Sequence, residues 1–269
     1  MNSALARSLR GISERLEQSL VAEEISHRTG WLQSLDARVK LVSILALVIA
    51  VSLARSLAVL VGLYLVALLL AWASAISLSF FIRRVWLALP FFTGVVALPA
   101  LFLTPGTPLV HLPLGLVVTQ SGAMTVLFLL LRVGTSASLA SLLVLTTPWA
   151  GLLRALTVLR VPDVVVLMLG MTYRYIYVLL YITNDMFLSR QSRVVGRLSP
   201  AQERSIEAAI AGTLLARSLQ VSGEVYLAMQ SRGFRGYAHA LRPGRMTWRD
   251  YAWAVMAALI VLATILLAR

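Results

Sequence analysis

Side chains that could do chemistry are few in this sequence and widely separated. The three histidines, His27, His111 and His239, lie far apart along the chain, so their spacing does not predict a metal site. Cysteine is absent, which excludes a disulfide, a thiolate metal site and a cysteine nucleophile. A GxxxxGK(S/T) sequence is also absent, so we do not expect ATP binding through a P-loop. We therefore expect no catalytic residue, no metal site and no cofactor in this chain.

The carboxylates give little support to an enzyme or to an autonomous carrier. Glu203 and Glu207 are interleaved with Arg204, a pattern typical of a solvated helix face. A proton- or sodium-coupled carrier usually has a carboxylate inside its membrane spans. Apart from Asp250 at the edge of one apolar run, no acidic residue falls in such a run. A self-contained secondary transporter and, less readily, a membrane-embedded enzyme stay open as alternatives.

The composition indicates a membrane protein. Of the 269 residues, 59% are hydrophobic and 13% are charged, and the mean hydropathy is +0.84. Soluble domains are roughly 45–50% apolar and about 25% charged, so an ordinary cytosolic or secreted enzyme is excluded. The net charge of +13 predicts basic cytoplasmic loops beside a lipid bilayer, and no nucleic-acid partner.

Apolar runs predict about five transmembrane helices. The runs cover residues 41–54, 57–82, 85–103, 117–146 and 250–268. Arg55-Ser56 is expected to be a tight turn between the first two spans, although a single bent helix over 41–82 is the alternative. Arg132 lies near the middle of the fourth run. A charge at that depth is costly, so Arg132 should face protein or water, unless it marks a misplaced helix end.

Basic residues set the expected orientation in the cell membrane. Arg38 and Lys40 precede the first span and Arg83-Arg84 follows the second, so both clusters belong in the cytoplasm. Residues 104–113, with three prolines and no basic residue, are then a short outside loop. The segment 183–249 holds ten arginines against four acidic residues and belongs inside. The N-terminus is therefore expected in the cytoplasm and the C-terminus outside.

These spans divide the chain into four expected parts. They are a cytoplasmic N-terminal segment (1–40), a membrane domain of four spans (41–146), a cytoplasmic coupling domain (147–249) and a last transmembrane helix (250–268). The expected fold class is therefore all-α, a polytopic membrane protein whose coupling domain consists of about three amphipathic helices.

The three helices of the coupling domain have recognisable boundaries. Residues 151–160 place leucines along one face, and Val161-Pro162 precedes a second helix expected over 163–195. Ser199-Pro200-Ala201-Gln202 has the form of a capping box that opens a third helix, which Gly233 would end in a left-handed conformation. The apolar faces of these helices need cover. They either pack on each other and on the spans, or form a docking platform for other subunits.

Four segments carry a family resemblance. They are Leu35-Asp36-Ala37-Arg38-Val39-Lys40-Leu41, Arg160-Val161-Pro162, Met171-Thr172-Tyr173-Arg174-Tyr175-Ile176 and Glu224-Val225-Tyr226-Leu227-Ala228-Met229-Gln230-Ser231-Arg232-Gly233-Phe234. In this order they resemble the T component, or transmembrane scaffold, of energy-coupling factor (ECF) transporters. The resemblance covers about residues 31–249 and is strongest to the cobalt/nickel type.

The resemblance implies a function and a set of docking residues. The family's Ala-Arg-Gly motifs map onto Ser192-Arg193-Val194, where only the arginine matches, and onto Ser231-Arg232-Gly233, where arginine and glycine match. These residues would dock two ABC-type ATPase subunits. A small membrane subunit would bind the substrate, cobalt or nickel ion, while this chain stays non-catalytic. ATP hydrolysis would then be transmitted through the coupling helices to uptake.

Overall fold

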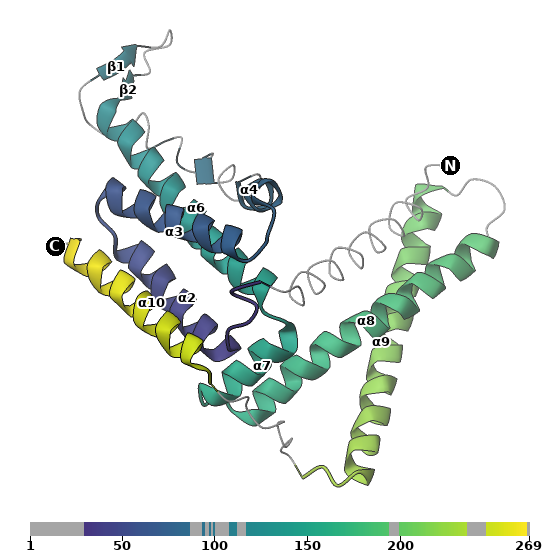
Figure 1. The fold of residues 1–269 in the computed structure, drawn as a ribbon. Helices are drawn as coiled ribbons and strands as arrows, with labels where there is room; N and C mark the ends of the chain where they lie inside the picture. The colour runs from purple at the N-terminus through teal and green to yellow at the C-terminus, as the bar shows by residue number, and fades with distance from the viewer. Residues whose placement is uncertain are drawn as a thin grey trace. The chain divides into compact units, whose positions relative to one another are not determined.

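The computed structural model describes residues 30–86, 93–94, 97, 99, 108–111, 117–193, 199–235 and 246–267. These residues form eight α-helices and one short antiparallel hairpin (Figure 1). They divide into two compact units. We name them the bundle unit, within 23–155 and 244–269, and the pair unit, within 156–243.

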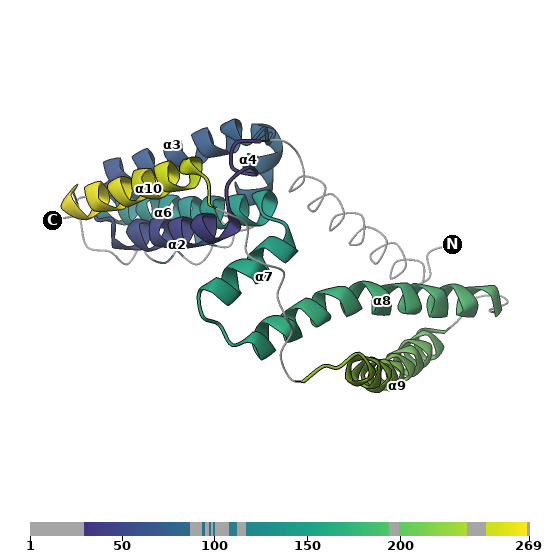
Figure 2. The ribbon, with the colours of Figure 1, turned by 60° about the horizontal axis from the view of Figure 1, so that its bottom comes forward.

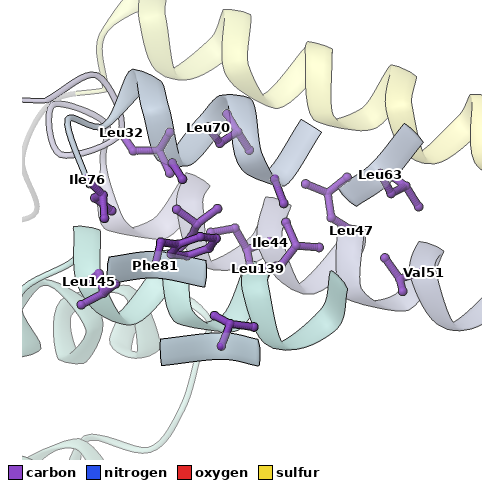
Figure 3. Packing of buried hydrophobic residues seen from close by; sticks show 14 of the residues in the cluster. Leu32, Ile44, Leu47, Val51, Leu63, Leu70, Ile76, Phe81, Leu139 and Leu145 are labelled. Atoms are coloured by element: carbon purple, nitrogen blue, oxygen red, sulfur yellow. The ribbon is translucent and has the colours of Figure 1, made fainter. Parts of the chain in front are cut away.

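Four helices dominate the bundle unit: α2 (Ala37–Leu53), α3 (Leu57–Ala73), α6 (Gln120–Thr146) and α10 (Trp248–Leu267). Helix α2 packs against both α10 and α6, and α3 packs against α6. Their shared core consists of aliphatic side chains such as Leu47, Leu60 and Leu142, all fully buried. Figure 3 shows Ile44 of α2 and Leu139 of α6 in this core beside Phe81. The core therefore joins segments from both ends of the chain.

The first apolar region forms two helices, as the turn at Arg55-Ser56 predicts. Helix α2 ends with Ala54 in an extended conformation. Ser56 then caps α3 because its hydroxyl accepts a hydrogen bond from the Val59 N–H. The alternative of a single bent helix over 41–82 is therefore wrong.

The helix expected over residues 57–82 ends earlier than the sequence predicts. Helix α3 ends at Ala73, and α4 (Leu78–Trp86) contains Arg83 and Arg84, which we had expected between spans. Ala75 adopts φ +53°. Its N–H donates to the Trp72 carbonyl and that of Ile76 to the Ala71 carbonyl, which is the Schellman pattern. The sequence does not signal this turn, because alanine instead of glycine occupies its left-handed position.

Part of the expected outside loop is a hairpin. Strand β1 (Pro108–His111) pairs with β2 (Val117–Thr119), so residues 108–111 are not an irregular loop. Thr119 ends β2 and also caps α6, because its hydroxyl accepts from the Gly122 N–H. The third apolar run, 85–103, falls mostly outside the described residues.

The described helices fit the expected class of polytopic all-α membrane protein. By length and composition, α6, α10 and residues 163–190 of α8 (Asp163–Arg193) could each cross a bilayer. Helices α2 and α3 have 17 residues each, or about 26 Å at ~1.5 Å per residue. The cytoplasmic placement of the helix over 163–195, the division into four parts and the orientation of the termini stay predictions.

Candidate docking site

The candidate docking residues lie on the two long helices of the pair unit, α8 and α9 (Pro200–Ser231). The break before α8 forms where expected. It follows α7 (Trp149–Val158) and places Arg160 at φ +64° two residues before Pro162. Asp163 lies in the first turn of α8, where a carboxylate complements the positive end of the helix dipole. The start of α8 therefore agrees with the sequence prediction.

Both ends of α9 have the predicted caps. The Ser199 hydroxyl accepts from the Gln202 N–H, and the Gln202 side-chain oxygen accepts from the Ser199 N–H, so the capping box is confirmed. Gly233 has φ +83°, and the N–H of Phe234 donates to the Met229 carbonyl over 3.0 Å. This Schellman motif confirms Gly233 as the helix terminator.

The motif residues lie at exposed helix ends. Ser231 is the last residue of α9, Arg232 is its C-cap and Gly233 follows, and all three are exposed. Ser192 and Arg193 end α8 and are also exposed, whereas Val194 lies outside the described residues. Each arginine is therefore accessible at the negative end of a helix dipole, where a cation is favoured.

The two helices cross instead of lying parallel (Figures 1 and 2). They touch through Phe187 of α8 and Ile210 of α9, with Met186 and Ile206 beside them. This contact joins the C-terminal part of α8 to the N-terminal part of α9. The ends that carry Arg193 and Arg232 are consequently found at opposite ends of the crossed pair.

A large apolar groove follows the other halves of the same helices. It has a volume of about 580 Å³ and is lined by α8 residues 164–179, α9 residues 218–229 and Phe234. On α9, Ile210 is the one buried residue, and Leu219 and Leu227 keep 68% and 65% of their surface exposed. The apolar face of α9 is thus not covered by the part of the chain that the structure describes.

Beside the helix contact, the surface near Arg193 is hollowed and of mixed charge. A depression of about 380 Å³ is lined by Asp185, Arg190, Arg193 and Thr213, among others. A guanidinium in such a setting can make paired hydrogen bonds to a carboxylate of a partner. The geometry fits a protein contact better than a catalytic centre.

Comparison with known proteins identifies the family. The family model described as cobalt transport protein, CbiQ, matches residues 28–243, which is most of the chain. The chain belongs to the CbiQ family. Members of this family are membrane components of transporters, and the resemblance to the T component of ECF transporters, cobalt/nickel type, is confirmed.

Two of three proteins similar to this CbiQ-family chain are named as transport proteins. It is 30% identical to a nickel permease, LarQ, of Lactiplantibacillus plantarum, over 95% of this chain and 84% of the relative. It is 27% identical to an energy-coupling factor transporter transmembrane protein, EcfT, of Lacticaseibacillus paracasei, over 88% and 93%. An uncharacterised protein of Methanocaldococcus jannaschii is 29% identical over 100% and 93%.

The described residues bring no metal-ligand cluster together. Among them, no group of three or more His, Cys, Asp or Glu side chains could hold a metal ion. His111 is in strand β1, whereas His27 and His239 lie outside the described residues.

Polar links inside the bundle of this CbiQ-family chain were not predicted. Asp250 accepts from the Asp36 N–H over 2.8 Å and from the Thr247 N–H and hydroxyl over 2.7 Å. The buried Lys40 ammonium donates to the Thr146 carbonyl over 2.9 Å. These links tie the starts of α2 and α10 and the end of α6 together. Asp250 stood out in the sequence as an acidic residue at a span edge. Its contact with Thr247, three residues earlier, is local, whereas Asp36 lies 214 residues away, too far along the sequence to be foreseen as a partner.

Arg132 faces protein, as one of its two interpretations predicted. Its Nη2 donates to the Ala54 carbonyl over 2.7 Å, and its guanidinium carbon lies 4.7 Å from the centroid of the Phe128 ring. Ala54 caps the end of α2, so its carbonyl has no partner within that helix. Arg132 thus satisfies a helix end inside the bundle, and the alternative of a misplaced helix end is wrong.

Proposed function

We propose that this chain is the coupling scaffold of an ECF-type importer in the cell membrane. Two ABC-type ATPase subunits hydrolyse ATP, and a small membrane subunit binds the substrate. This chain holds both and transmits the movement between them without a catalytic role of its own. In this proposal the N-terminus and the pair unit are cytoplasmic and the C-terminus lies outside.

The observation that carries the proposal is the pair of exposed arginines at opposite ends of the crossed helices. Arg193 and Arg232 each lie at a helix C-terminus without being buried by the described chain. Two separated cationic ends suit two separate partners with acidic grooves. Because long helices join the two ends, a displacement of one partner is transmitted along roughly 45–50 Å of helix.

The apolar groove supports a second contact, with the membrane subunit. Its lining includes Met168, Met171 and Met229, whose flexible thioether side chains adapt to a partner surface. An uncovered apolar surface of this size is typical of an interaction site. We assign it to the subunit that binds the substrate.

Cobalt or nickel ion is the proposed substrate of the assembly. The matching family is described as cobalt transport protein, and one relative is named a nickel permease. Imidazole suits nickel, and the described part of this chain holds no group of three or more His, Cys, Asp or Glu side chains that could bind a metal ion. The metal is therefore assigned to the substrate-binding subunit.

The first prediction tests the docking of the ATPases. Arg232→Glu places a carboxylate where the proposal requires a cation against acidic partner groups. A charge pair that is broken in this way weakens an interface by about 2–5 kcal/mol, or roughly thirtyfold or more. We expect a mild-detergent pull-down of the tagged variant to recover far less ATPase than the wild type, and Arg193→Glu combined with it to recover none.

A matched control makes the outcome specific. Arg217→Glu reverses an exposed charge on the same helix, where Arg217 donates to the Gln220 side chain, away from the cap. This variant should retain both ATPases. Undiminished ATPase recovery with the Arg193 and Arg232 double variant would refute the docking role. A wild-type chain that transports metal after purification by itself would favour a self-contained carrier.

A further inference from the structure

A polar pocket in the bundle unit belongs neither to the docking ends nor to the apolar groove. It has a volume of about 210 Å³ and lies where the start of α2 meets the start of α7. A water molecule occupies about 30 Å³ of liquid, so the pocket has room for a small polar group. Gly151 permits this meeting, since a Cβ at that position would lie 3.3 Å from the Cβ of Ala37.

The pocket has more positive than negative groups. Arg38, Lys40 and Arg154 line it, against the carboxylate of Asp36, and the Asp250 carboxylate lies beside it as the acceptor of the Asp36 N–H. Asp36 is engaged locally, because it accepts from the Arg38 N–H over 3.0 Å and lies 3.6 Å from the Arg38 Nε. Helix α7 also begins at the pocket wall, which adds the positive end of its dipole. An anion is therefore the ligand that this field favours.

Two buried polar atoms at the pocket indicate a ligand with oxygen atoms. The Thr147 side chain is 3% exposed, and its hydroxyl has no hydrogen-bond partner among the described residues. The Gln33 Oε1 is likewise buried without a partner there, while its Nε2 donates to the Ser74 carbonyl. Buried polar groups are rarely left unpaired. A phosphate oxygen could accept a hydrogen bond from the Thr147 hydroxyl.

The level of the pocket in the bundle favours a lipid over a soluble ion. The backbone N–H of Asp36, at the pocket, donates a hydrogen bond to the carboxylate of Asp250. Asp250 lies two residues after Trp248, which is highly exposed at the start of α10. Trp31, also exposed, makes an edge contact with the Trp253 ring at 5.4 Å between centroids. Tryptophans of this kind gather at the level of lipid headgroups. Basic pockets on the cytoplasmic side of membrane bundles are suited to anionic headgroups.

We infer that this pocket binds the phosphate of an anionic glycerophospholipid, with Arg38 and Arg154 on the phosphate oxygens and Thr147 as a hydrogen-bond donor. The bound headgroup bridges the starts of α2 and α7. It thereby fixes the point at which the chain leaves the bundle. This inference does not depend on the ATPase docking proposed above.

The test measures lipid binding to the purified full-length chain by native mass spectrometry in a neutral detergent. The probes are phosphatidylglycerol, phosphatidylcholine and inorganic phosphate. We expect phosphatidylglycerol to be retained and phosphatidylcholine to be lost. Removing charge-assisted hydrogen bonds with Arg154→Gln should weaken phosphatidylglycerol binding roughly tenfold, and Thr147→Val should weaken it a few-fold.

Controls separate a site from general surface charge. Arg249→Gln removes an exposed arginine near the same end of the bundle and should leave binding unchanged. Because Arg154 is exposed, its substitution should not unfold the chain, and an unchanged circular dichroism spectrum checks this. The inference would be overturned if Arg249→Gln weakened phosphatidylglycerol binding as much as Arg154→Gln does. It would also be overturned if the wild-type chain retained phosphatidylcholine as well as phosphatidylglycerol. Competition by inorganic phosphate at equal concentration would overturn the assignment to a lipid.

Discussion

At the scale of single residues, Arg132 has the clearest energetic role. It lies in the middle of α6, yet its guanidinium is held by the Ala54 carbonyl and by the face of the Phe128 ring. Ala54 is fully buried, so the loss of this donor would leave a carbonyl without a partner away from water. Arg132 is therefore a structural cation in the bundle, and its position does not require a role in ion transport.

Substitution of Arg132 tests whether it stabilises the bundle. Arg132→Met keeps much of the side-chain volume but removes the donor, and should destabilise the bundle by about 2 kcal/mol. The thermal unfolding temperature in detergent should fall by several degrees. Arg55→Met, which removes an exposed arginine next to the same helix end, should leave it unchanged. Normal stability of Arg132→Met would show that the Ala54 contact contributes nothing.

At the scale of elements, the helix ends explain which boundaries could be predicted. Gly233 and the Ser199–Gln202 box use the residue types that caps favour, so both ends of α9 could be predicted from local sequence. The end of α3 uses the same Schellman geometry with Ala75, a residue type that does not signal it. The apolar run 57–82 therefore predicts one span, although the chain forms α3 and the start of α4 there.

The same comparison predicts a stabilising substitution. Ala75→Gly relieves the steric cost of a left-handed alanine, and Ala75 is exposed, so little packing is lost. We expect the free energy of unfolding to rise by about 1 kcal/mol. Differential scanning fluorimetry in detergent would measure the change. Ala73→Gly, at the last residue of α3 and two positions earlier, should lower stability instead. A fall in stability with Ala75→Gly would contradict the argument.

The candidate docking site could be predicted only where it depends on local sequence. Arg232 and Gly233 belong to one local motif, so their exposure at a helix end followed from sequence. The crossing of α8 and α9 depends on the contact between Phe187 and Ile210, and the groove depends on that crossing. Neither helix has a pattern that specifies where it meets the other. Contacts between residues so far apart need the folded structure.

At the scale of the whole molecule, the proposal separates metal handling from energy coupling. If this chain is only the scaffold, its histidines are dispensable. The triple substitution of His27, His111 and His239 by Ala should leave cobalt or nickel uptake by the full complex close to the wild-type rate. Uptake of the radioactive ion into cells that contain the complex would measure this. A loss of uptake while the complex remains assembled would assign a metal-handling role to this chain.

The hydrogen bond between Asp36 and Asp250 joins residues 214 positions apart, and it has a consequence for synthesis. Helix α10, which packs against one face of α2, is translated after α2 and after all the helices between them. At roughly 5–20 residues per second, the interval is on the order of 10 to 40 seconds. During that time the uncovered face of α2 must be shielded by lipid or by the insertion machinery. A chain truncated before α10 should therefore be a preferred target for membrane proteases.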